Sequence, residues 1–410
     1  MQTSLTDAFL QTAAGKDADQ ILRNCVHCGF CNATCPTYQL TGDELDGPRG
    51  RIYLVKQMLE GHTPSARTRL HLDRCLTCQA CETTCPSGVV YHHLLETGRQ
   101  TLEHRLPRPV RQRGLRWLLR KVLTRPHLFG PLLKLGQWSG PFLPRALRLK
   151  IPRTRPVRSF KPASRHSRSM LLLDGCVQPT LAPQINRATR RVLDSLGIHT
   201  LIAPDSGCCG ALSHHLDATD EALDFMRRNI DAWWPAVETG AEAIVITASG
   251  CAPMVKDYGR LLSADADYAG KAERISTLAR DLSEVISNEK PFDRLSPLPD
   301  QQKIAFHSPC TLQHAQQLNG VVEALLEQAG YVLLPVTDSH LCCGSAGTYT
   351  ILQPQLAAQL RDNKLRTLQE NGPAMIATAN IGCLTHMENH ARVPVRHWIE
   401  LIDTLLPETD

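Results

Sequence analysis

Residues 25–36 read CVHCGFCNATCP, and residues 75–86 read CLTCQACETTCP. Each run places four cysteines as Cys-x-x-Cys-x-x-Cys-x-x-x-Cys-Pro, the spacing found in proteins that hold two iron–sulfur clusters. In that arrangement, the three closely spaced cysteines of a run hold one [4Fe–4S] cluster, and the cysteine before the proline holds the other. The spacing therefore predicts one cluster on Cys25, Cys28, Cys31 and Cys85, and a second on Cys75, Cys78, Cys81 and Cys35.

The alternative for these runs is a pair of zinc sites, because zinc also binds Cys-x-x-Cys pairs. Zinc ribbons join two such pairs, however, and do not place four cysteines in a row before a proline. The insert between the runs has helical periodicity at Ile52, Val55 and Leu59. Residues 1–104 are therefore predicted to form an α-helical ferredoxin domain with two [4Fe–4S] clusters, which is suited to one-electron transfer.

Arg49 and Arg51 also lie between the two cysteine runs. A cluster held by four thiolates is anionic, so an arginine beside it would raise its reduction potential. The alternative is that both arginines are solvated residues of a loop.

Charge and cysteine content indicate where the protein works. The 410 residues carry a formal net charge of +5, but His104 to Leu173 contains 18 Lys and Arg and no Asp or Glu, so a basic segment interrupts an otherwise acidic chain. The N-terminus lacks the features of a secretory signal, and no apolar run is long enough to cross a bilayer. In a reducing compartment, 16 cysteines indicate metal ligands or redox thiols rather than disulfides. We expect a cytoplasmic protein, peripheral on the cytosolic face of the inner membrane.

The basic segment, residues 105–168, is predicted to be a Pro/Arg-rich linker with amphipathic helices. Aromatic residues accompany its arginines, namely Trp117, Phe129, Trp138 and Phe142. Such a segment can lie on an anionic membrane surface or dock on an acidic partner. The remaining alternatives are nucleic-acid binding and a charged linker folded onto the core.

The rest of the chain is a duplication, predicted to form two α/β repeats over residues 169–295 and 296–410. Cys176 and Cys310 are 134 residues apart, as are Cys208 and Cys342, and Cys251 and Cys383 are 132 apart. In each repeat the cysteines follow short apolar runs that predict parallel strands. The fold class is therefore an α+β multidomain chain, with the helical ferredoxin domain followed by the duplicated α/β domain and its Cys-Cys-Gly motifs.

Because the carboxyl ends of parallel strands share one sheet edge, the cysteines of each repeat should converge there. The two sets are Cys176, Cys208, Cys209 and Cys251, and Cys310, Cys342, Cys343 and Cys383. Four soft ligands suit a further iron–sulfur cluster or tetrahedral zinc. A vicinal dithiol for thiol exchange and buried structural cysteines are the other interpretations. His386, in Cys383-x-x-His386, could reach the same metal.

These motifs together resemble those of the iron–sulfur subunits of bacterial glycolate oxidases over essentially the whole chain. The resemblance rests on the first cysteine run, on Gly47-Pro48-Arg49-Gly50-Arg51 and on the two Cys-Cys-Gly motifs. The wider group includes lactate-utilisation proteins, the iron–sulfur subunit of anaerobic glycerol-3-phosphate dehydrogenase, and heterodisulfide reductase subunits. Heterodisulfide reductase-like proteins end their Cys-Cys-Gly motif in Cys-x-x-Cys, whereas Met254 and His386 stand at those positions here, so their five-cysteine noncubane cluster is not expected.

The resemblance implies a redox subunit of an oxidoreductase complex. FAD-bearing partner subunits would oxidise glycolate, and this chain would pass electrons from that flavin towards quinone. Lactate or glycerol-3-phosphate dehydrogenase complexes are the alternatives from the same group, and a nucleic-acid-binding iron–sulfur protein is an alternative from another class. The substrate would bind on another chain, and no residue of this chain is expected to be catalytic.

Overall fold

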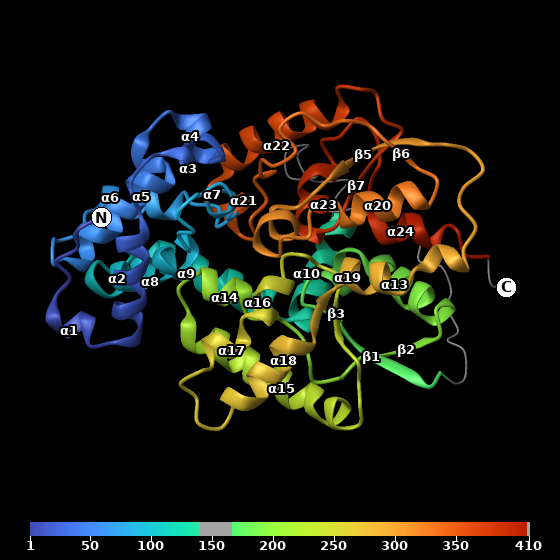
Figure 1. The fold of residues 1–410 in the computed structure, drawn as a ribbon, viewed down its shortest axis with the longest axis horizontal. Helices are drawn as coiled ribbons and strands as arrows, with labels where there is room; N and C mark the ends of the chain where they lie inside the picture. The colour runs from blue at the N-terminus through green and yellow to red at the C-terminus, as the bar shows by residue number, and fades with distance from the viewer. Residues whose placement is uncertain (140–165, 408–410) are drawn as a thin grey trace.

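A computed structural model gives the fold and describes residues 1–139 and 166–407. The linker residues 140–165, with the predicted aromatic anchor Phe142, lie outside the described part. Three bodies are visible in Figure 1: the N-terminal helices in blue, the first repeat in green and yellow, and the second repeat in orange and red. The predicted fold class, helical ferredoxin domain followed by duplicated α/β repeats, is confirmed.

The N-terminal domain is built from short helices around the two cysteine runs. They are α1 (Asp7–Leu10), α2 (Ala13–Asn24), α3 (Phe30–Ala33), α4 (Pro36–Thr41), the 3₁₀ turn η1 (Glu44–Asp46), α5 (Pro48–Leu59), α6 (Ala66–Asp73), α7 (Ala80–Thr83) and α8 (Tyr91–Arg105). The predicted apolar face of α5 is buried. Helix α8 lies close against it at Gly98, where an added Cβ would stand 2.5 Å from a methyl group of Val55. This close crossing forms the core between the cysteine runs.

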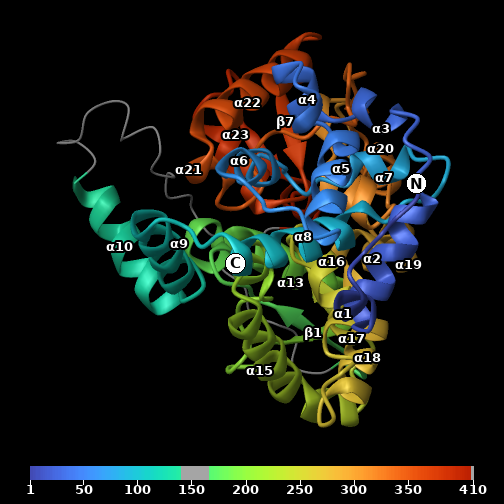
Figure 2. The same cartoon turned by 90° about the vertical axis from the view of Figure 1, so that its left-hand side faces the viewer.

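Helices α9 (Val110–Leu123) and α10 (Pro126–Ser139) form a hairpin within the basic segment. In Figure 2 the hairpin stands at the side of the molecule. Its arginines hold it to the other bodies: Arg108 pairs with Asp73 of α6 and Asp217 of the first repeat, and Arg120 pairs with Glu221. Part of the basic charge is therefore used inside the molecule.

Each repeat contains a four-stranded parallel sheet. The first sheet has the order β2-β1-β3-β4 and the second the order β6-β5-β7-β8. The strands are β1 (Arg168–Leu173), β2 (Ile198–Leu201), β3 (Ile244–Ile246), β4 (Ala279–Asp281), β5 (Lys303–His307), β6 (Val332–Leu333), β7 (Met375–Thr378) and β8 (Val395–His397). Six of them lie at the predicted apolar runs, whereas the edge strands β4 and β8 are additional.

The strands of the two repeats correspond one to one, but the helices of the described residues do not. The first repeat contains α12 (Gln178–Leu181), α13 (Pro183–Ser195), α14 (Ala211–His215), α15 (Thr219–Glu238), α16 (Ala252–Lys256), α17 (Tyr258–Leu261), α18 (Ala269–Leu278) and α19 (Leu282–Asn288), followed by the turn η3 (Pro291–Asp293). The second contains the π turn η4 (Thr311–Ala315), α20 (Val321–Gln328), α21 (Tyr349–Leu352), α22 (Pro354–Gln369), α23 (Ile381–Glu388) and α24 (Trp398–Asp403).

The two repeats pair with approximate twofold symmetry. Helix α13 packs on α24 of the other repeat, and its counterpart α20 packs on α19, the counterpart of α24. One hydrophobic core runs through both sheets, joining β1 to β5. Near the carboxyl ends of β3 and β7, the amide of Ser249 donates to the carbonyl of Ala379 at 3.2 Å. This pairing brings the cysteine-bearing edges of both sheets into the middle of the molecule.

Candidate metal centres

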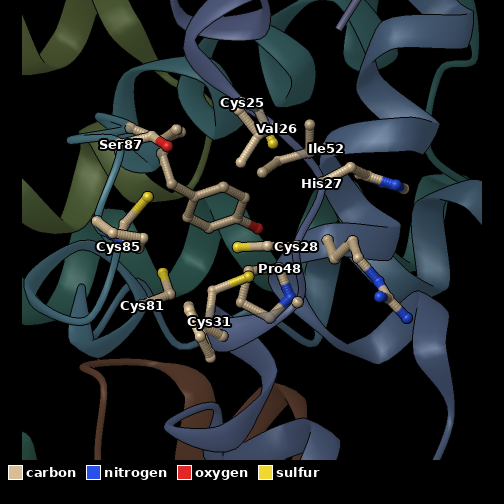
Figure 3. A pocket seen from close by; sticks show the side chains of 16 residues that line it. Cys25, Val26, His27, Cys28, Cys31, Pro48, Ile52, Cys81, Cys85 and Ser87 are labelled. Carbon is tan, nitrogen blue, oxygen red and sulfur yellow. The ribbon is translucent and has the colours of Figure 1, made fainter.

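The first cysteine-lined cavity lies in the N-terminal domain. Figure 3 shows sulfur atoms of both runs facing this cavity. Its cysteines are Cys25, Cys28, Cys31, Cys81 and Cys85. Four of them are the predicted ligands of the first cluster, drawn from runs that are about fifty residues apart in sequence. The fold therefore brings Cys85 of the second run beside the three closely spaced cysteines of the first run, in agreement with the prediction from the spacing.

The second cavity is lined by Cys35, Cys75, Cys78 and Cys81. These are the predicted ligands of the second cluster. Cys81 borders both cavities, as does Tyr91, whose hydroxyl donates to the Cys75 sulfur at 3.7 Å. The assignment of each cysteine to one cluster agrees with these two linings and stays a prediction.

Both cysteine loops have the same unusual backbone. The residue before the second cysteine and the residue after it are left-handed: His27 and Gly29 in the first run, with φ of 61° and 89°, and Thr77 and Gln79 in the second, with φ of 52° and 60°. Successive turns of this kind aim backbone N–H groups into a concave anion site. Three side chains other than glycine accept this strain, which indicates that the surrounding fold over-determines the loops.

The donor chemistry fits an iron–sulfur cluster. All sixteen cysteines are free thiols. Burial, together with neighbouring thiolates, raises the pKa of Cys31 to about 11 and that of Cys81 well above its ordinary value. Thiols crowded in this way ionise only beside a compensating cation, and iron in a cluster supplies one.

Arg51 is buried beside the second cavity, which excludes the solvated-loop alternative for this residue. It donates to the carbonyl of His71 at 2.8 Å and to the Thr37 hydroxyl at 3.2 Å. Thr37 in turn contacts the Cys35 sulfur at 3.3 Å. Burial alone would lower the pKa of Arg51, but the negative charges around it, with those at Cys75 and Tyr91 foremost, raise it. Arg51 is therefore a fixed cation at the second cavity.

A buried acid, Asp46, completes this arrangement, and no motif of the sequence predicted it. Asp46 accepts hydrogen bonds from His71 Nδ1 at 2.8 Å and from Arg74 at 2.7 Å, and its carboxylate lies 3.7 Å from the Arg51 guanidinium. Arg49, by contrast, borders the first cavity and pairs with Glu44 at 2.6 Å on the surface. The two arginines thus serve different cavities, one buried and one partly exposed.

The second Cys-Cys-Gly set lies directly against the second cavity. Cys310 and Cys342 have sulfur atoms 3.8 Å apart, and the thiol of Cys343 is hydrogen-bonded to those of Cys342 and Cys383. Leu76 and Cys78 pack with Cys310 and Cys342 in one apolar cluster that also contains Tyr349. Burial, then the charge of Cys310, raises the pKa of Cys78. The structure therefore joins the ferredoxin domain to the second repeat at a row of cysteines.

The first Cys-Cys-Gly set is arranged in the same way within its own repeat. A hydrogen bond with Cys208 and burial raise the pKa of Cys176, while Cys209 adjoins both Cys208 and Cys251. Contacts of this repeat with the N-terminal domain come from α8, where Glu96 meets His214 at 3.0 Å. The two Cys-Cys-Gly sets therefore have similar thiol contacts, but the second set packs against the second cavity of the ferredoxin domain.

The glycine of each Cys-Cys-Gly motif allows a left-handed backbone conformation. Gly210 and Gly344 are left-handed, with φ of 91° and 84°. A Cβ on Gly344 would stand 2.8 Å from the carbonyl oxygen of Ala357, so the loop packs tightly on α22. The loop therefore approaches a helix closely, and its left-handed conformation favours glycine.

The histidines of the second repeat take different places from those expected. His386 turns towards the carbonyl of Ala357, 3.2 Å from its Nε2. His307, at the end of β5, instead lies with Cys343 and Cys383, and the nitrogen and sulfur atoms of the three lie within 4.8 Å of one another. Burial lowers the pKa of His307 to about 3, so the ring is neutral. The sequence showed only a lone histidine before Cys310.

The α9–α10 hairpin carries an exposed apolar surface. Its exposed side chains are Val110, Leu115, Trp117, Leu118, Leu128, Leu132, Leu135 and Trp138. Arg111, Arg113 and Lys134 are exposed on the same two helices. Among the described helices, none combines the length and hydrophobicity needed to cross a membrane.

Comparison with known protein families matches the ferredoxin domain and both repeats. A model of the 4Fe-4S dicluster domain matches residues 21–89, and a model of the cysteine-rich CCG domain matches residues 170–256 and 304–388. The glycolate oxidase iron-sulfur subunit of Escherichia coli (strain K12) is 56% identical over 406 residues, covering 99% of each chain. The probable glycolate oxidase iron-sulfur subunit of Bacillus subtilis (strain 168) is 29% identical, covering 90% of this chain and 88% of that one.

More distant relatives share part of the chain or only its fold. Lactate utilization protein A of Bacillus licheniformis is 24% identical over 56% of this chain and 96% of its own length. A crystal structure of a hypothetical protein from Helicobacter pylori superposes with a TM-score of 0.56 at 10% identity, covering 98% of this chain and 74% of that one. The latter likeness concerns the fold alone.

Proposed function

Because the chain belongs to the family of glycolate oxidase iron–sulfur subunits, we propose that it relays electrons within a membrane-associated, flavin-dependent 2-hydroxy-acid dehydrogenase. Electrons enter from FAD on a partner subunit and leave towards quinone. Glycolate is the favoured substrate class, because the relative at 56% identity covers both chains almost completely, whereas the lactate-utilisation relative covers 56% of this chain.

The observation that carries the proposal is the pair of sulfur-lined cavities. Cys25, Cys28, Cys31 and Cys85 hold one [4Fe–4S] cluster in this proposal, and Cys75, Cys78, Cys81 and Cys35 hold the other. When bound, such a cluster accepts and releases one electron at a time. The Cys-Cys-Gly sets are further soft-ligand sites, suited to an additional cluster or to zinc.

The exposed side of the first cavity is the proposed contact for the flavin-bearing partner. Cys28 is exposed, and its neighbours Val26 and Phe30 are 67% and 62% exposed. Large apolar side chains at the mouth of a redox site suit burial against another protein. The second cavity, by contrast, faces the second repeat, so its cysteines lie on the way out of the ferredoxin domain.

Substitution of Cys78 by serine tests the relay. In the purified complex, glycolate should still bleach the partner's flavin within one turnover, whereas quinone reduction should fall at least tenfold. Ala33→Ser is the matched control, because it adds a serine hydroxyl to an exposed position of α3 in the other cysteine run. Iron and acid-labile sulfide per chain should fall by about four atoms each in Cys78→Ser. Unimpaired quinone reduction with a full loss of one cluster would refute the relay.

The hairpin is the proposed contact with the cytosolic face of the inner membrane. Two tryptophans and several leucines lie exposed on it beside Arg111, Arg113 and Lys134. An amphipathic element with this composition inserts its apolar face into the headgroup region of an anionic bilayer. The paired arginines, Arg108 and Arg120, keep its other side on the protein.

Vesicle flotation tests this contact. Leu132→Glu together with Leu135→Glu should abolish co-flotation with anionic vesicles at low salt, because both side chains are exposed on one face of α10. Ile351→Glu is the matched control, since Ile351 is an exposed apolar residue of the second repeat. Equal flotation of the hairpin variant and the control would contradict a membrane role for the hairpin.

A further inference from the structure

His307 is a buried histidine with an unused nitrogen. It is 2% exposed, and its Nδ1 lies 3.0 Å from the Thr378 hydroxyl. Its Nε2 has no hydrogen-bond partner in residues 1–139 and 166–407. A buried nitrogen without a hydrogen bond destabilises the folded chain, so its persistence needs a reason.

The His307 ring also lies among buried thiols, and Nε2 is its nitrogen without a hydrogen bond to the described residues. The ligand atoms of His307, Cys343 and Cys383 are mutually within 4.8 Å, and all three residues are buried. Cys342 adjoins Cys343 and offers a further sulfur. Metal-binding histidines usually fix their ring by a hydrogen bond from the other nitrogen, as His307 can do by donating from Nδ1 to Thr378. A set of one imidazole and several thiolates is a ligand set of tetrahedral zinc.

The first repeat does not have this histidine. The 134-residue offset that relates Cys176 to Cys310 places Leu173 opposite His307. Leu173 is buried and apolar. The two Cys-Cys-Gly sets therefore differ in chemistry as well as in surroundings: the first offers sulfur alone, and the second offers sulfur and nitrogen.

We propose that the second repeat holds a zinc ion on His307 Nε2 and the sulfurs of Cys343 and Cys383, with Cys342 as the available fourth donor. This refines the metal-binding role proposed above for the second set, and it does not depend on the relay. With four protein ligands the site is closed to substrate, so the zinc is structural. It ties β5, the Cys-Cys-Gly loop and α23 together beneath the surface on which Leu76 and Cys78 rest.

Metal analysis and zinc-edge X-ray absorption of the anaerobically purified complex test the site. The wild-type complex should contain one zinc per chain with mixed sulfur and nitrogen ligation. His307→Leu, which copies the first repeat, should lose that zinc while keeping the iron of both ferredoxin clusters. His307→Cys should retain zinc with sulfur ligation only. His386→Gln is the matched control, since His386 faces the carbonyl of Ala357, and it should keep the wild-type spectrum.

Each contrary result has a distinct meaning. Equal zinc and an unchanged spectrum in His307→Leu would overturn the assignment of His307. Iron in place of zinc at the second set would overturn the zinc site but leave the relay standing, because the relay is judged by Cys78→Ser. If His307→Leu is poorly folded, the soluble His307→Cys variant decides, since loss of zinc there contradicts the site.

Discussion

Arg51 shows how a single residue can set the properties of a redox site. Its guanidinium is buried between Thr37, the carbonyl of His71 and the carboxylate of Asp46, beside the second cavity. A fixed positive charge stabilises the more negative, reduced state of a neighbouring cluster. The sequence placed Arg51 between the cysteine runs, but only the fold shows that water does not screen its charge.

Replacing Arg51 by glutamine should lower the reduction potential of the second cluster. Loss of the charge should shift the midpoint by about 60 mV or more, a tenfold change in a one-electron equilibrium. Redox titration followed by EPR measures this shift, and Arg51→Lys should recover part of it. Arg49→Gln is the control at the first cavity; equal shifts in both variants would show that the effect is not local to Arg51.

The spacing of the cysteines made the cluster ligands predictable from the sequence. The lone histidine, His307, offered no comparable pattern. Three cysteines within seven residues can only converge, so the ligand groups follow from the sequence. His307 and Asp46 have no such pattern around them, because their partners, Cys383 and His71, come from distant or unrelated segments. Convergence of that kind depends on the tertiary fold.

The α9–α10 hairpin depends on a buried charge network where it leaves α8. Arg108 donates to both oxygens of Asp73, at 2.5 and 2.9 Å, and to Asp217 at 3.0 Å. Burial opposes ionisation of Asp73, but the hydrogen bonds and charge of Arg108 outweigh it and hold the pKa of that carboxyl below its usual value. The network therefore connects the hairpin, the N-terminal domain and the first repeat.

Arg108→Ala should destabilise the folded chain by about 3 kcal/mol, since it leaves buried carboxylates without their partner. Denaturant unfolding of the holo-complex measures the loss. Arg23→Ala, at an exposed pair with Asp19 within α2, should cost less than about 1 kcal/mol and serves as the control. An equal decrease in the free energy of unfolding in both variants would show that the Arg108 network stabilises the fold no more than a surface pair does.

The same network predicts an acid dependence. The folded pKa of Asp73 is depressed, so its contribution is present above the unfolded value of about 4 and is lost as the pH falls through the folded value. Proteolysis at the hairpin should therefore accelerate below about pH 4 in the wild type. In Asp73→Asn the rate should be raised at neutral pH and respond less to acid; an unchanged profile would contradict the assignment.

The strands illustrate what local pattern can and cannot show. Apolar runs before each cysteine predicted six strands, and Leu171 to Leu173 or Ala305 to Phe306 are buried as expected. The edge strands β4 and β8 each have three residues and contain Arg280 and Arg396. Such short polar segments become strands only because a parallel neighbour offers hydrogen bonds, which no window of sequence records.

In the whole molecule, the ferredoxin domain contacts both repeats. Thr83 meets His314 at 2.9 Å, Tyr349 donates to the carbonyl of Arg74 at 3.0 Å, and Glu96 meets His214. The duplication was readable from its constant offset, and so was the convergence of each cysteine set. The packing of the second cavity against Cys310 and Cys342 could not be read from the sequence, since those contacts join segments more than 200 residues apart.

The contact of the second cavity with the second repeat has a consequence for cluster assembly. Cys78 is partly covered by the second repeat, whereas Cys28 is exposed. In the folded chain, we therefore expect iron and sulfide to reach the second site less readily than the first. Under air, we expect the exposed cluster to be damaged first and rebuilt by the assembly machinery without unfolding. We expect the partly covered cluster to persist longer under the same conditions.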